Sequence, residues 1–150
     1  MTCKFFGSLE KLADVMVVAK DGWCIFGGAA FALHGIVAEP VKDIDLIVSP
    51  CDAARLMTAY GWKNLADGGT ERFRSTIIFR PVLGDMPVEI LSGFQSRCGG
   101  GWGDIDIPEV ILVSAGSAMV PVPTRQALAL MFRACGRPKD VAKAALLELG

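Results

Sequence analysis

The sequence predicts a mixed α/β (α+β) fold in which helices pack on a mixed β-sheet. In the first half of the chain, apolar runs of strand length alternate with stretches of helical period. The second half continues with short apolar runs separated by glycine-containing turns. This order of elements is typical of a sheet covered by helices. At 150 residues, 52% of them hydrophobic, the chain is expected to form a single domain over residues 1–150.

The first sixty residues predict five elements in turn. They are a helix over 8–20, a strand over 23–26, a helix over 28–34, a strand over 43–48 and a helix over 52–60. The last helix is expected to use Asp52 as a cap, because a carboxylate at a helix start accepts hydrogen bonds from free N–H groups.

The next stretch predicts three strands, over 62–65, 73–79 and 86–91. Turn signals separate them at 67–69 and 83–85. Beyond these strands, residues 101–107 hold glycines and a pair of aspartates, Asp104 and Asp106. This segment is predicted to be a surface loop away from any functional site, because no strand and helix precede it to build one.

The most informative motif is Asp43-Ile44-Asp45 at the head of the strand predicted over 43–48. Side chains alternate along a strand, so Asp43 and Asp45 share one side while Ile44 enters the core on the other. Two carboxylates spaced in this way suit Mg²⁺, which takes one or two protein carboxylates and fills its other positions with substrate phosphates and water. An acidic pair that is merely solvated is the alternative.

Context favours the metal reading. A glycine pair, Gly27 and Gly28, stands between the strand at 23–26 and the helix that follows it. A helix start preceded by glycines offers free backbone N–H groups and the positive end of the helix dipole, which suit a phosphate. The order of strand, glycine pair, helix and acidic strand therefore predicts a phosphate cradle beside a metal site.

These motifs resemble the nucleotidyltransferase-fold proteins related to DNA polymerase beta, in particular their small bacterial and archaeal members. The resemblance is carried by the run FGGAAFALHG at 26–35 and by KDIDL at 42–46. It extends to the segment 121–140, which is similar to the closing part of the family, where one helix follows a proline-containing turn and a second begins near a Lys-Asp pair. The resemblance implies a nucleotidyltransferase-like sheet and a third acid on a neighbouring strand, for which Glu89 is the best match.

The resemblance also implies a set of site residues. Asp43, Asp45 and Glu89 would be the catalytic and metal-binding acids. The residues expected to bind the nucleotide are Gly27, Gly28, Lys42, Arg74 and Lys139.

Three positions depart from the family pattern. Many relatives carry an arginine and a threonine or serine just before the acidic pair, where this chain has Glu39 and Val41. Many also carry a lysine on the penultimate helix, near Met131 of this chain. Each departure removes a group that could bind a triphosphate.

The activity that the resemblance implies is transfer of a nucleoside monophosphate from a nucleoside triphosphate to a hydroxyl acceptor, with Mg²⁺ as cofactor and pyrophosphate as leaving group. The acceptor stays open between a small molecule, RNA and protein. Two alternatives remain: a nucleotide-binding or protein-interaction module that kept the fold without turnover, and the toxin component of a toxin–antitoxin pair.

Composition limits the partners. A net charge of −1 and a pI near 5.8 argue against an extended nucleic-acid surface. The stretch 22–38 lacks charged residues but is shorter than a membrane span, and the N-terminus lacks a signal-peptide layout. Five cysteines without paired spacing predict neither disulfides nor a zinc site, so a cytoplasmic location without a membrane partner is expected. The single histidine, His34, is expected to be a packing residue.

Overall fold

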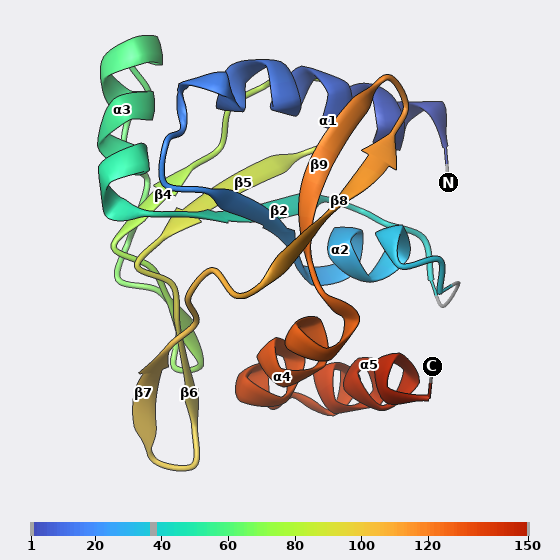
Figure 1. Ribbon diagram of the computed structural model, residues 1–150. Helices are drawn as coiled ribbons and strands as arrows, with labels where there is room; N and C mark the ends of the chain where they lie inside the picture. The colour runs from blue at the N-terminus through green and yellow to red at the C-terminus, as the bar shows by residue number, and fades with distance from the viewer. Residues whose placement is uncertain (1, 37–38, 150) are drawn as a thin grey trace.

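The computed structural model describes residues 2–36 and 39–149, and its centre is a four-stranded sheet (Figure 1). The strands lie in the order β1-β2-β5-β4, with bounds Trp23–Phe26, Ile44–Val48, Val88–Ser92 and Ile77–Phe79. The two central strands, β2 and β5, run parallel, and both outer strands pair antiparallel. The mixed sheet confirms the predicted fold class.

Helices cover this sheet on both sides (Figure 1). Helix α1, Cys3–Val15, followed by the short 3₁₀ turn Met16–Val18, lies on one side, and α4 and α5 lie on the other. Helix α2 spans Gly27–Leu33, α3 spans Pro50–Tyr60, α4 spans Arg125–Cys135 and α5 spans Pro138–Glu148. Helix α4 packs against α5, joined by Gly136 in the left-handed region that ends α4. None of the helices between residues 2 and 149, outside the gap at 37–38, is long and apolar enough to cross a membrane.

Two further β units flank the central sheet. Strands β3, Phe73–Arg74, β6, Gln95–Cys98, and β7, Gly101–Asp104, form a small antiparallel sheet that projects beside α4 (Figure 1). Strands β8, Val110–Ala115, and β9, Ala118–Pro123, form a hairpin. The sequence analysis missed this hairpin, although its apolar strands and the turn at Gly116 are visible signals.

Several predicted boundaries were wrong. The first helix begins at Cys3 rather than at residue 8, because the Thr2 hydroxyl accepts a hydrogen bond from the N–H of Phe5 and caps it there. The stretch 62–65 is not a strand. Its Leu65 N–H donates to the carbonyl of Ile78, but the N–H of Ile78 donates to the Asn64 side chain, so no backbone ladder forms.

Two segments changed type or role. The strand predicted over 73–79 is split between β3 and β4, which belong to different sheets. The loop predicted over 101–107 begins with strand β7, paired with β6.

Helix α3 starts at Pro50 with Ser49 as its cap, so Asp52 is not the cap residue. The buried Asp52 carboxylate instead accepts hydrogen bonds from the N–H groups of Lys20 and Asp21.

Candidate active site

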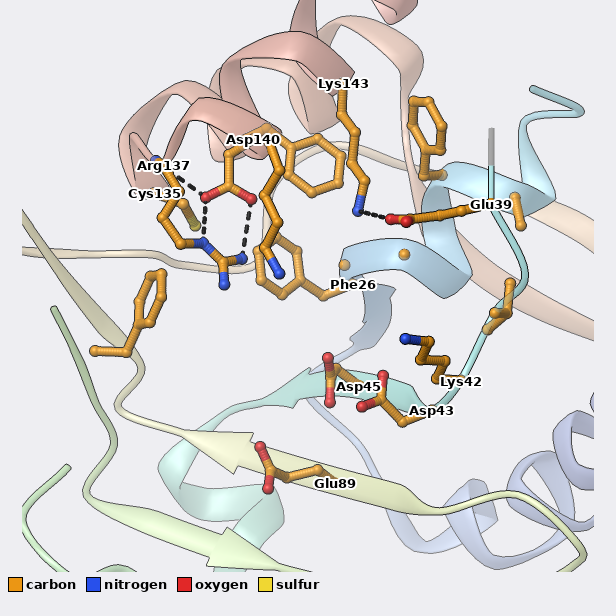
Figure 2. Close-up of a pocket in the computed structure, with 18 of the residues that line it drawn as sticks. Phe26, Glu39, Lys42, Asp43, Asp45, Glu89, Cys135, Arg137, Asp140 and Lys143 are labelled. Atoms are coloured by element: carbon orange, nitrogen blue, oxygen red, sulfur yellow. Dashed lines mark hydrogen bonds and ion pairs between the residues drawn. The ribbon is translucent and has the colours of Figure 1, made fainter. Parts of the chain in front are cut away.

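A cavity of about 510 Å³ opens between the sheet and the pair α4–α5 (Figure 2). Its lining comes from segments that are distant in sequence: the start of α2, the residues leading into β2, strand β5 and the start of α5. Of the eight residues that the sequence analysis assigned to the site, seven line this cavity. They are Gly27, Gly28, Lys42, Asp43, Asp45, Glu89 and Lys139.

The acids are brought together by the central sheet. Asp45 is the second residue of β2 and lies opposite Glu89 of β5 in the parallel register. Asp43 stands just before β2, on the same side of the chain as Asp45. Figure 2 shows the Asp43 and Asp45 carboxylates next to one another, with Glu89 on the neighbouring strand. The alternating Ile44 and Leu46 are fully buried in the core below.

Asp45 has an altered affinity for protons. Burial, followed by the negative charges of Asp43 and Glu89, raises the pKa of Asp45 to about 7, against a smaller opposing effect of Arg137. Confined carboxylates that repel one another are stabilised by a cation. The electrostatics of this pair therefore favour a bound metal ion.

The third acid has a different partner. Glu89 accepts a hydrogen bond and ion pair from the guanidinium of Arg80, with 2.8 Å between Arg80 Nε and Glu89 Oε2. Among the residues described, no group of three His, Cys, Asp or Glu side chains is placed to hold a metal ion. Asp43 and Asp45 alone nevertheless supply the one or two carboxylates that Mg²⁺ takes from a protein, so the donor set fits this ion.

The glycine pair is required by the geometry. Gly27 has a φ of +65°, and a Cβ added there would lie 3.2 Å from Asp45 Oδ2. Any side chain would therefore strain the backbone and crowd the acid. Phe26, which precedes α2, makes no side-chain cap, so the N-cap residue leaves the first N–H groups of α2 free to face a ligand.

Two cations that were not predicted line the cavity, Lys143 on α5 and Arg137 at the position just before that helix. Lys143 has a side chain only 15% exposed and lies 3.7 Å from Glu39 Oε1. Its Nζ lies 5.8 Å and 5.6 Å from the ring centres of Phe31 and Phe132. A Cβ added at Gly28 would lie 4.0 Å from that Nζ. Lys143 thus places a positive charge directly beside Gly28.

Arg137 is the other cation. Its guanidinium forms two hydrogen bonds with the buried Asp140 and lies 4.8 Å from the ring centre of Phe73. The hydrogen bond to Asp140 raises the pKa of Arg137 by more than burial lowers it. The guanidinium therefore keeps its positive charge. A sequence signal existed for Arg137, which stands just before the Lys-Asp pair at the start of α5, but not for Lys143, one turn further along the helix.

The other residues singled out in the sequence differ in whether they line the cavity. Arg74 does not line the cavity, since its Nε donates to Gln95 at 2.6 Å and its guanidinium lies 4.2 Å from the ring centre of Trp102. Glu39 and Val41 line the cavity, whereas Met131 is buried in the core.

Two further expectations can be checked by position. Asp104 accepts a hydrogen bond from Gln95, and neither Asp104 nor Asp106 is among the residues lining the cavity. The Nε2 of His34 donates to the Pro123 carbonyl at 2.8 Å, which ties α2 to β9. The histidine has a packing role there.

Solved structures similar to this chain cover nearly its whole length. A candidate nucleotidyltransferase from Thermotoga maritima is 24% identical, with a TM-score of 0.67 over 94% of this chain and 88% of its own. The lincosamide antibiotic adenylyltransferase LnuA, solved with lincomycin bound, is 15% identical, with a TM-score of 0.56 over 99% of this chain and 97% of its own.

A third similar structure is ANT(2″)-Ia in complex with adenylyl-2″-tobramycin, which is 16% identical, with a TM-score of 0.50 over 98% of this chain and 86% of its own. No protein-family model matches the sequence, and no curated protein matches it significantly. At these levels of sequence identity, the structural similarity shows the fold alone.

Proposed function

This chain has the nucleotidyltransferase fold, and we propose that it transfers a nucleoside monophosphate from a nucleoside triphosphate to a hydroxyl acceptor with Mg²⁺. The observation that carries the proposal is one cavity in which Asp43, Asp45 and Glu89 face the glycine pair and the cations of α5. Carboxylates for a metal and cations for a triphosphate then lie on opposite sides of the space where the transferred phosphorus would sit.

Each residue has a part in this reaction. Asp43 and Asp45 would hold Mg²⁺, and the bound ion would supply positive charge to offset the negative charge of the phosphates. Glu89 takes the proton of the acceptor hydroxyl, and Arg80 is the positioning residue that holds the Glu89 carboxylate.

The cations bind the triphosphate. Lys143 and Arg137 are fixed by their own contacts, which lowers the entropy lost when they engage a phosphate. Lys42 and Lys139 line the same cavity and add positive charge. Lys143 on α5 supplies a positive charge to the cavity, whereas Met131 on α4, near the position where many relatives carry a lysine, is buried in the core.

A second function is favoured by one observation. Glu89 is already paired with Arg80, and Lys143 is already paired with the acidic Glu39. Both pairings occupy groups that catalysis would use, and a nucleotide-binding module without turnover could keep them. Turnover separates the two functions.

The test is a melting experiment on the whole chain with Mg²⁺ and each of ATP, CTP, GTP and UTP. A ligand at a hundred times its Kd stabilises the native state by about 2.7 kcal/mol, so a rise of several degrees in Tm is expected with at least one triphosphate. The double variant Asp43→Asn/Asp45→Asn should lose this rise. The matched control is Asp14→Asn/Asp106→Asn, which removes the same charge from two exposed positions outside the cavity and should keep it.

Pyrophosphate release then separates the two functions. Release in the presence of a panel of RNA, protein and small hydroxyl acceptors, suppressed by Glu89→Gln while the melting shift persists, supports the transferase. A shift with no release from any acceptor supports the binding module. If no triphosphate raises Tm, both the transferase and the nucleotide-binding module are contradicted.

A further inference from the structure

A second cavity lies on the other side of the three acids. Its volume is about 390 Å³, and it is walled by the connection between β4 and β5. The two cavities have only three lining residues in common, Asp43, Asp45 and Glu89. The acids therefore form a partition with a separate space on each side.

The order of groups across the sheet gives the two spaces different chemistry. From the outer strand β1 towards β4 come the glycine pair at the end of β1, Asp45 on β2, Glu89 on β5 and Arg80 after β4. The lysines and Arg137 line only the first cavity. Among the described residues that line the second cavity, the one cation is Arg80, already paired with Glu89. A triphosphate is thus attracted to the first cavity and not to the second.

We propose that the second cavity binds the acceptor, and that the acceptor is a small hydroxyl compound with a protonated amine and an apolar face. The inference rests on the proposed function and adds to it the place and chemical class of the acceptor.

The reaction geometry requires such a place. In phosphoryl transfer the attacking and leaving oxygens lie roughly in line through the phosphorus. The acceptor oxygen forms its bond to the α-phosphorus as the bond from that phosphorus to the α,β-bridging oxygen breaks, pyrophosphate leaves with the electron pair, and the hydroxyl proton passes to Glu89. With the leaving phosphates beside Lys143, the acceptor must approach the acids from the opposite side, where the second cavity opens.

The size and walls of the cavity suit a small molecule with an apolar face. A volume of about 390 Å³ is in the usual range for small-molecule sites. Pro81, Met86 and Val88 line it, and Val82 at its edge is 95% exposed. No other large apolar side chain in the described part of the chain is as exposed as Val82. A bound molecule with an apolar face would cover it and remove that surface from water.

The charges of the lining select a cation. Four carboxylates, those of Asp43, Asp45, Asp85 and Glu89, face one guanidinium. With a metal on the aspartate pair and Arg80 on Glu89, Asp85 remains as an exposed acid without an ion-pair partner among the described residues. An amine beside Asp85 gains a charge-assisted hydrogen bond, whereas a carboxylate there is repelled.

The test uses three probes that share one ring: trans-4-aminocyclohexanol, 4-methylcyclohexanol and 4-hydroxycyclohexanecarboxylate. Each is titrated into the ¹⁵N-labelled full chain with Mg²⁺ present, so that the aspartate pair is neutralised, and without nucleotide, while amide NMR signals are followed. We expect the amine to shift the amides of Val82, Gly84 and Asp85, with a Kd at least threefold lower than that of the carboxylate. Asp85→Asn should bring that ratio close to one, and Val82→Ser should weaken all three probes. Asp14→Asn, the same change at an exposed position outside both cavities, should alter nothing.

The inference is overturned by amide shifts confined to the first cavity, or by a carboxylate that binds as tightly as the amine. A separate titration with Mg²⁺ and ATP, read at Gly27 and Gly28, tests the proposed function by itself. Amine shifts at residues 82–85 alongside ATP shifts at the glycine pair support the acceptor site. Amine shifts without any triphosphate binding show an amine site and overturn its role as an acceptor site.

Discussion

At the scale of single residues, Asp45 holds a proton more tightly in the folded chain than in the unfolded one, because its pKa is raised to about 7 by burial and by its acidic neighbours. A raised folded pKa contributes stability at low pH that is lost as the pH rises through that value. Between about pH 4 and pH 7 the metal-free chain should therefore lose stability through this residue.

The corresponding prediction is that Asp45→Asn stabilises the metal-free protein at pH 8 and not at pH 4. The expected gain at pH 8 is at least about 1.4 kcal/mol, equivalent to one pKa unit. Thermal unfolding at the two pH values measures it, with Asp14→Asn as control. An equal difference at both pH values would show that the effect is not due to proton binding.

Lys143 is the second residue whose role can be isolated. Lys143→Met keeps the length and packing of the side chain against Phe31 and Phe132 but removes the charge. The Kd for ATP with Mg²⁺ should rise about tenfold, since a hydrogen bond to a charged group contributes about 1.5–3 kcal/mol. Glu39→Gln should lower that Kd, because it frees Lys143 from its ion pair.

Titration calorimetry measures both changes. Lys11→Met, which removes an exposed lysine on α1, is the matched control and should leave the Kd unchanged. An unchanged Kd for Lys143→Met in a protein that does bind ATP would remove Lys143 from the nucleotide site while leaving the proposed function standing.

At the scale of elements, helix α3 is attached to the chain before β1 by several polar contacts, and the buried one is made by Asp52. The Asp52 carboxylate accepts hydrogen bonds from two N–H groups and from Arg55 Nη1 at 2.7 Å. Burial alone would raise the pKa of Asp52, but these hydrogen bonds outweigh burial and lower it. Its stabilising contribution is therefore present above the ordinary carboxylate pKa and lost as the pH falls.

Asp52→Ala should lower the free energy of unfolding by about 2–3 kcal/mol, because it leaves the N–H groups of Lys20 and Asp21 without their partner. Asp52→Asn should have a smaller effect, since one acceptor oxygen remains. Urea unfolding at pH 7 measures both, and the difference between parent and Asp52→Ala should shrink at pH 3. A loss that does not change with pH would contradict the charge argument.

The elements also show what sequence reasoning can reach. Strands β1 and β2 were predicted to within a residue because each is a local apolar run with clear ends. The split between β3 and β4 was not predicted, because its cause lies on other strands. Gly93, with φ of +66°, separates β5 from β6, so residues 73–74 and 77–79 find partners in different sheets. A run of residues that is uniform in sequence cannot reveal such a break.

At the scale of the whole molecule, the residues of the candidate site also divide into those with a local sequence signal and those placed by distant parts of the chain. The acidic pair and the glycine pair could be predicted because their spacing along the chain is itself the signal. Lys143 could not, because it meets Gly28 only after α5 folds across the cavity, 115 residues further along the sequence. The prediction for Arg74 was wrong because Gln95 and Trp102, neither of them near it in sequence, hold its side chain outside the cavity.

The hairpin β8–β9 affects the behaviour of the whole molecule in solution. Within residues 2–36 and 39–149, β8 pairs only with β9, and its Ile111 and Leu112 are 45% and 66% exposed. An apolar strand with a free edge promotes association between chains. Leu112→Lys should therefore reduce light scattering on heating while changing Tm by less than about 2 °C. Ser114→Lys, on the same exposed strand, controls for added charge alone.

The antiparallel connection between β4 and β5 gives the fold a modular character. Residues 80–87 wall the second cavity and join two strands whose own residues Phe79 and Ile90 are locked in the core. Exchanging residues 81–86 would alter the surface beyond the acids while leaving Arg80, which holds Glu89, and the β2–β5 register untouched. Selection, or a protein engineer, could thus change what the second cavity recognises by replacing this loop alone, with the arrangement of the three acids kept.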